Sequence, residues 1–150
     1  MKTEHILVLE DAPLVRNQLR MRLEAEGYRV SVASQISEAL HSVQTHMPDL
    51  VVLDLTLAED GASSGVADGF AFLRLLRGTY AETDAAVVIF SASDTLEVEA
   101  RAKAMGVFAT VQKKEGLSAL LTAIRTALDE RKYKHAEAAT ADDPDFGRSF

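Results

Sequence analysis

Residues 50–55 read Leu-Val-Val-Leu-Asp-Leu, an apolar run that delivers an aspartate, Asp54, at its end. Three further apolar runs also lead directly into polar side chains: residues 6–9 into Glu10 and Asp11, residues 86–90 into Ser91, and residues 108–112 into Lys113. Short, nearly continuous apolar runs are typical of strands that are buried on both faces of a parallel sheet. Each predicted strand therefore presents a polar group at the same end.

Stretches with apolar residues at helical spacing separate these strands, and one more follows the last strand. The stretches cover residues 13–27, 34–47, 68–78, 94–106 and 117–128, and residues 28–33 alternate as an additional strand. Strands that alternate with helices predict a parallel sheet with helices on both faces and right-handed crossovers. We therefore expect an α/β fold with a doubly wound, five-stranded parallel sheet and five helices.

Several residues are suited to helix ends. Pro13 fits the first turn of its helix, and Gly27 fits the position just after the last turn. Ser34 is the predicted cap of the second helix. The segment from Asp94 to Glu97 has the pattern of a capping box, in which two side chains satisfy free backbone amides at the start of a helix.

Composition limits the classes of function. The chain has 150 residues, a formal net charge of −7 and no cysteine, which excludes disulfides and thiolate metal sites. Its length predicts one domain with a proper core. The negative charge argues against nonspecific nucleic-acid binding, and no apolar run is long enough for a membrane span. Since the first residues show no signal peptide, we expect a cytoplasmic protein with no nucleic-acid and no membrane partner.

The helical pattern weakens near Lys134. The residues that follow are small and acidic, and they show no apolar periodicity. We therefore expect a folded domain over residues 4–133, and a frayed helix end with a disordered acidic tail over residues 134–150. No second folded module is expected.

The polar side chains at the strand ends predict a site, because ligands of such sheets bind at the carboxyl ends of the strands. Carboxylates that lie close together repel one another unless a cation neutralises them, and Mg²⁺ prefers such oxygen ligands. An ionised aspartate beside that ion can attack phosphorus. Lys113 would then pair with phosphoryl oxygens, and Ser91 would donate a hydrogen bond to one of them.

With these residues in place, the chain resembles the receiver domain of two-component response regulators, the CheY-like family, over roughly residues 4–130. The matching residues follow the first, third, fourth and fifth strands in the family's order: Glu10-Asp11, Asp54, Ser91-Ala92 and Lys113, with Gly106 ahead of the lysine. The resemblance implies the flavodoxin-like strand order 2-1-3-4-5.

The resemblance also implies a role for each site residue. Asp54 would be the phosphoacceptor, and Glu10 and Asp11 would organise Mg²⁺ together with Asp54. The backbone carbonyl of Thr56 would be a further metal ligand. Ser91 would sense the phosphoryl group, and Lys113 would bind it.

Two positions depart from the family's pattern near the last strand. Lys114 stands where the family usually has a proline, and Thr110 stands where it usually has an aromatic switch residue. The usual coupling, in which an aromatic side chain moves inward after phosphorylation, therefore cannot operate in the usual way. Phe90 and Phe108 are close in sequence, but their pattern predicts core packing instead.

A third departure is the long connection from Asp54 to Gly69. It contains an insertion over residues 58–67, which we interpret as a tolerated surface loop because long loops cost little. A lid or recognition loop beside the metal site is the other interpretation. The four histidines show no metal-ligand spacing and are predicted to lie on the surface; they are His5, His41, His46 and His135.

We therefore expect a single-domain response regulator that takes a phosphoryl group from a histidine kinase or a histidine phosphotransfer protein onto Asp54. It would be no enzyme beyond its own phosphorylation and dephosphorylation. An unidentified downstream protein would receive the output, and a homodimer is conceivable through the last helix. A receiver excised from a larger hybrid kinase would look similar.

Other functions remain as alternatives. The main one is an interaction module that keeps the receiver fold but works without phosphorylation. Dehalogenase-like phosphatases need a second aspartate where this chain has Thr56, so that class fits poorly. A flavodoxin-like cofactor binder would need a phosphate-binding loop where this chain has Glu10 and Asp11, whose charges repel phosphate.

Overall fold

The computed structural model describes residues 3–55, 66–79, 84–92 and 96–141. These residues form five strands and five α-helices in regular alternation. In chain order they are β1 (His5–Leu9), α1 (Pro13–Ala25), β2 (Arg29–Ala33), α2 (Ile36–Thr45), β3 (Leu50–Leu53), α3 (Val66–Thr79), β4 (Ala86–Ser91), α4 (Leu96–Ala104), β5 (Ala109–Gln112), a 3-10 turn η1 (Lys113–Glu115) and α5 (Leu117–Ala141).

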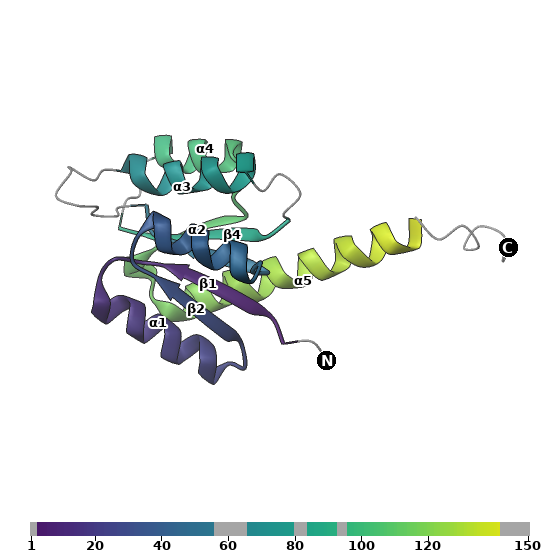
Figure 1. Ribbon diagram of the computed structural model, residues 1–150, viewed down its shortest axis with the longest axis horizontal. Coiled ribbons are helices and arrows are strands. Elements are labelled where there is room, and N and C mark those ends of the chain that lie inside the picture. Colours follow the sequence, from purple (N-terminus) through teal and green to yellow (C-terminus); the bar gives the residue numbers. More distant parts are fainter. Residues whose placement is uncertain (1–2, 56–65, 80–83, 93–95, 142–150) are drawn as a thin grey trace, which may run out of the picture.

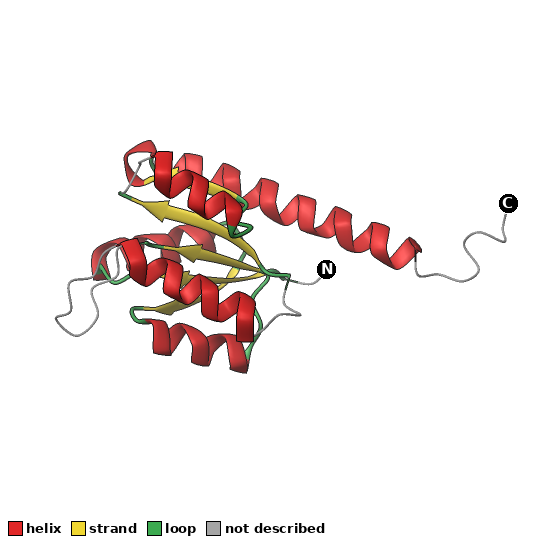
Figure 2. Cartoon of the chain, turned by 90° about the horizontal axis from the view of Figure 1, so that it is seen from above, coloured by secondary structure: helices red, strands yellow, loops and turns green. Residues whose placement is uncertain are grey.

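All strand pairs are parallel, and their order across the sheet is β2-β1-β3-β4-β5. Figures 1 and 2 show the sheet between two layers of helices. One core cluster joins the sheet to α2, α3 and α4, and the other joins its opposite face to α1 and α5. The predicted doubly wound sheet with strand order 2-1-3-4-5 is confirmed.

The central strands β1 and β3 are buried along their whole length, as their apolar sequences require. Neighbouring residues on each strand point to opposite faces, so Leu7 and Leu9 enter one cluster while Ile6 and Val8 enter the other. A strand with both faces covered has no room for polar side chains inside the sheet. The polar groups are therefore confined to the strand ends.

The helix signals of the sequence are mostly confirmed. Pro13 is the first residue of α1, and Gly27 follows its end with φ of 97°, a conformation that glycine adopts without strain. Ser34 is not the cap of α2, because Gln35 holds that position; the Ser34 hydroxyl donates to Glu38 instead. The predicted capping box of α4 begins in residues outside the described part.

Helix α5 is longer than the sequence pattern indicated. It continues to Ala141, so residues 134–141 are helical where a disordered tail was expected; residues 142–150 lie outside the described part. The C-terminal part of the helix extends past the rest of the domain (Figure 1), and residues 132–136 are exposed, so an apolar stripe is not required there. Alanine, the strongest helix former, is frequent in this stretch.

Arg131 anchors this extended helix to the sheet. Its guanidinium lies 2.9 Å from a carboxylate oxygen of Asp49, just before β3, and 2.9 Å from one of Asp84, before β4. The two contacts use separate nitrogens of one planar group, which fixes the orientation of the side chain. The ends of β3 and β4 opposite the polar cluster are therefore tied to α5.

Two placements differ from the sequence predictions. His5 is not a surface residue: only 3% of it is exposed, and its Nε2 lies 2.7 Å from the hydroxyl of Ser31 on the neighbouring strand. Phe108 is not a core residue, since 36% of it is exposed, whereas Phe90 is buried as expected. Both errors concern residues at or next to the start of a strand. A shift of one residue there moves a side chain from the core to the surface or the reverse.

Gly69 brings α3 against the backbone that follows β3. Its amide donates to the carbonyl of Leu55 at 3.3 Å. A Cβ atom at this position would lie 2.6 Å from the Cα of Leu55 and 2.9 Å from the carbonyl oxygen of Asp54. Both atoms belong to the main chain and cannot move aside cheaply, so only glycine allows this approach.

We expect Gly69→Ala to lower the free energy of unfolding by about 1–3 kcal/mol, because the added methyl group forces α3 away from residues 54 and 55. Urea denaturation measures this change. Gly78→Ala is the matched control on the same helix, since a Cβ there meets nothing within 4 Å. That variant should be as stable as the wild type or slightly more stable. Equal stability of Gly69→Ala and Gly78→Ala would contradict the close approach.

Burial of His5 predicts a pH-dependent stability. Burial, and then the charge of Arg29, lower the pKa of His5 below 6.5, so the folded state favours the neutral ring. The contribution to stability is complete above pH 6.5 and is lost as the pH falls through the lower pKa of the folded state. His5→Gln should reduce the loss of stability at low pH, as measured by urea denaturation across this pH range. His41→Gln, at an exposed histidine, should leave that loss unchanged. An identical pH profile for His5→Gln and the wild type would contradict this assignment.

Candidate functional site

The polar residues that end β1, β3, β4 and β5 meet at one edge of the sheet. The strand register places Leu9 beside Leu53, and Leu53 beside Ile89. The ladder also continues one residue past two strands: the amide of Glu10 donates to Ala33 and the amide of Asp54 donates to Leu9, each at 3.0 Å. Glu10 and Asp54 are therefore held by the sheet itself.

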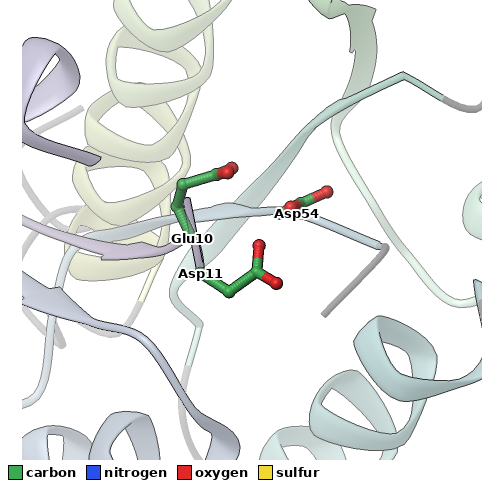
Figure 3. Close-up of side chains that lie close together, drawn as sticks. All are labelled: Glu10, Asp11 and Asp54. Atoms are coloured by element: carbon green, nitrogen blue, oxygen red, sulfur yellow. The ribbon is translucent and has the colours of Figure 1, made fainter. Parts of the chain in front are cut away.

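Three carboxylates converge at this edge (Figure 3). One oxygen of each of Glu10, Asp11 and Asp54 lies within 4.8 Å of the others. Glu10 and Asp54 are each only 2% exposed, while Asp11 is partly exposed and points toward Asp54 in the close-up. This spacing allows a single cation to contact all three groups.

Lys113 supplies the positive charge of the site. Its ammonium lies 3.1 Å from an oxygen of Glu10 and 3.6 Å from an oxygen of Asp54. The lysine begins the 3-10 turn that follows β5, and this turn is closed by Glu115, whose carboxylate accepts a 2.7 Å hydrogen bond from the amide of Gln112. The turn thus directs the ammonium back over the sheet edge.

The charges of the site do not balance. Burial, and then the negative charge of Asp54, raise the pKa of Glu10 to about 7, although Lys113 acts in the opposite direction. Partial burial alone would lower the pKa of Lys113, but attraction to Asp54 and Glu10 raises it overall. One ammonium therefore does not offset three close carboxylates, and the arrangement favours a further cation.

Ser91 is the last residue of β4 and is completely buried. It pairs with Gln112, the residue before Lys113. The structure thus brings five of the six predicted site residues to the same end of the sheet: Glu10, Asp11, Asp54, Ser91 and Lys113. The sixth, Thr56, lies outside the described part, as do residues 58–65 of the insertion, whereas residues 66 and 67 begin α3.

The sequence analysis missed one residue that shapes the site. Arg16, on the first turns of α1, donates from one guanidinium nitrogen to the carbonyls of Glu10 and Asp11, at 3.1 and 3.3 Å. The amide of Ala12 also donates to the Glu10 carboxylate at 3.3 Å. These bonds hold the turn between β1 and α1. An arginine shortly after an acidic pair is a weak sequence signal, because most such arginines face solvent.

Comparisons with known proteins agree with this arrangement. A family model for the response regulator receiver domain matches residues 6–142. The KDP operon transcriptional regulatory protein KdpE of Escherichia coli K12 is 31% identical over 140 residues, which cover 93% of this chain and 56% of that protein. The response regulator MprA of Mycobacterium ulcerans is 31% identical over 134 residues, covering 89% and 54%. The chain thus spans about half the length of these curated relatives.

Solved structures show the same fold. The non-phosphorylated receiver domain of HemR from Leptospira biflexa is 28% identical with a TM-score of 0.72, covering 84% of this chain and 94% of that one. A CheY-like receiver domain from Methanospirillum hungatei JF-1 is 21% identical with a TM-score of 0.76, covering 89% and 99%.

No helix in the described part of the chain is long and apolar enough to cross a membrane. The sheet order, the acidic cluster beside a lysine, the family model and the curated relatives all lead to one assignment. The chain belongs to the family of response-regulator receiver domains of two-component systems.

Proposed function

We propose that Asp54 accepts a phosphoryl group from a histidine kinase or a histidine phosphotransfer protein in a reaction that needs Mg²⁺. The convergence of Glu10, Asp11 and Asp54 beside Lys113 carries this proposal. A buried cluster of like charges is costly to keep unless a bound cation and a phosphoryl group use it. Family membership supports the same chemistry.

The donor set suits a hard divalent cation. The three carboxylates provide oxygen ligands close enough for one ion, and Mg²⁺ commonly binds through a few carboxylates while it retains water. We propose that Glu10, Asp11 and Asp54 hold the ion, with the backbone carbonyl of Thr56 as a further ligand. When bound, Mg²⁺ would offset the negative charge that accumulates during phosphoryl transfer.

Each protein group then has one task. A carboxylate oxygen of Asp54 forms the bond to phosphorus, while the bond from phosphorus to the donor's histidine nitrogen breaks and that nitrogen keeps the electron pair. Lys113, already 3.6 Å from Asp54, pairs with the phosphoryl oxygens. Ser91 donates a hydrogen bond to one of these oxygens. Catalysis by the chain is limited to its own phosphorylation and dephosphorylation.

The output is proposed to be a contact with another protein or a further phosphotransfer step. The names of KdpE and of other relatives describe transcriptional regulation, and those relatives are longer than this chain. Independence from nucleic acid and a cytoplasmic location, both expected from the sequence, therefore remain predictions. The same holds for the activity as a single-domain regulator and for a homodimer through α5.

Thr110 favours a second candidate, an interaction module that works without phosphorylation. The position lies on the edge strand β5 and is partly exposed, and threonine provides no aromatic ring to move between the surface and the core. A receiver of this kind would bind its partner equally well with and without a phosphoryl group. The acidic cluster would then have no evident use, so we rank this function second.

Incubation with Mg²⁺ and acetyl phosphate should add one labile phosphoryl group to the wild-type chain, as seen by intact-mass spectrometry. Asp54→Ala should lose the adduct completely, because its side chain has no oxygen to attack phosphorus. Asp129→Asn removes an exposed carboxylate on α5 and should behave like the wild type. No adduct on the wild type from either acetyl phosphate or a phosphorylated histidine donor would favour the phosphorylation-independent module.

Mg²⁺ should also stabilise the fold without any phosphodonor. At a tenfold excess over its dissociation constant the ion would add about 1.4 kcal/mol to the free energy of unfolding. Asp11→Asn should weaken this stabilisation, because a carboxylate ligand is lost while the phosphoacceptor remains. Asp129→Asn is the matched control and should retain the full effect. Identical Mg²⁺ titrations for Asp11→Asn and the wild type, followed by thermal denaturation, would show that Asp11 is not a ligand.

A further inference from the structure

A cavity of about 230 Å³ lies at the opposite end of the sheet from the acidic cluster. Its wall includes the start of β4 at Ala85 and Ala86 and the residue that precedes β5, Phe108. Helix α3 contributes Arg77 from its last turn, and α5 closes the other side. No residue of the cavity belongs to the site proposed for phosphoryl transfer.

Arg77 is the unusual residue of this cavity. Its guanidinium is partly buried and donates to the main-chain carbonyls of Ala85, at 3.2 Å, and Gly106, at 3.5 Å. Burial lowers its pKa, although the charge of Asp84 acts in the opposite direction. Within the part of the chain that the structure describes, Arg77 forms no ion pair with a carboxylate. A buried cation bound only to carbonyls retains donors for an anion.

Two carboxylates line the cavity in the described part of the chain, Asp84 and Glu130, and Asp84 is engaged by α5. Asp84 accepts from Arg131 at 2.9 Å through one oxygen and contacts His135 through the other. Both partners belong to α5, so Asp84 is held toward that helix. Lys134, also on the cavity wall, adds a second positive charge near the opening.

Apolar groups form much of the remaining wall, beside Glu130 and Arg131 of α5. Ala85, Ala86 and Ala127 form small apolar surfaces, and the ring of Phe108, which is 36% exposed, stands beside them. Leaving a large aromatic side chain in contact with water costs free energy, which a ligand that covers the ring would recover. The cavity thus combines an apolar patch with a cationic group, Arg77, that forms no ion pair with a carboxylate of the described residues.

We propose that this cavity binds a small organic carboxylate whose remainder is apolar, with the carboxylate on Arg77 and the apolar part against Phe108. Arginine presents paired N–H donors that match the two oxygens of a carboxylate. The volume admits a compact molecule and excludes a helix or a folded segment. The site is independent of the proposed phosphoryl transfer, since it needs neither Mg²⁺ nor Asp54.

Benzoate is the probe for this site. A ¹⁵N-labelled wild-type sample, free of Mg²⁺ and at constant ionic strength, should show saturable amide shifts at Ala85, Ala86 and Phe108, with a dissociation constant of about 1 mM. Acetate, which lacks the apolar part, and benzyl alcohol, which lacks the charge, should each bind at least tenfold more weakly. Shifts confined to the acidic end of the sheet, or no saturable shifts, would overturn the proposal.

Substitutions at Arg77 and Phe108 test separately how the charge and the apolar contact contribute to benzoate binding. Arg77→Gln keeps an amide donor for the carbonyls but removes the positive charge, and it should weaken benzoate binding at least tenfold. Arg77→Lys should restore part of the affinity. Phe108→Ala, at an exposed position, should weaken benzoate but leave acetate unchanged.

Lys103→Gln is the matched control, because it removes one positive charge at an exposed position on α4 and should bind like the wild type. Equal loss of benzoate binding in Lys103→Gln and Arg77→Gln would show that affinity depends only on the net charge of the protein, and it would overturn the proposal. Unchanged binding in Arg77→Gln would do the same.

Discussion

Repulsion between like charges is the constraint on which the rest of this structure depends. Glu10, Asp11 and Asp54 are brought together by a sheet whose interior tolerates no polar group, and Lys113 offsets only part of their charge. The raised pKa of Glu10 is the direct consequence. A site of this kind is stable only if the surrounding core holds it, which is why the buried strands β1 and β3 deliver two of the three carboxylates.

The two ends of the parallel sheet differ in how their charges are compensated. At the carboxyl ends of the strands three carboxylates gather beside one lysine. At the other end Arg131 ties α5 to Asp49 and Asp84, before β3 and β4, and Arg77 binds main-chain carbonyls beside a cavity. A parallel sheet makes this separation possible, because each of its edges gathers the same end of every strand.

The errors of the sequence analysis have a common cause. The strands, the helix alternation and five of the six site residues follow from local patterns, since burial on both faces requires apolar runs and the runs end where the polar residues begin. The burial of His5 and the anchoring of α5 do not follow, because each depends on a distant neighbour. Ser31 on β2 partners His5, and Asp49 and Asp84 hold α5 through Arg131.

The sequence alone therefore determined the α/β class, the family resemblance and the polar residues that meet at the carboxyl ends of the strands, because periodicity and strand-end polarity are local properties. Only the tertiary structure decided how close the carboxylates lie, that burial and the charge of Asp54 raise the pKa of Glu10, and that Arg16 holds their turn. It also decided that Arg77 faces a cavity without a carboxylate partner among the described residues. Distances, burial and charge compensation arise between segments far apart in the chain, so no local pattern contains them.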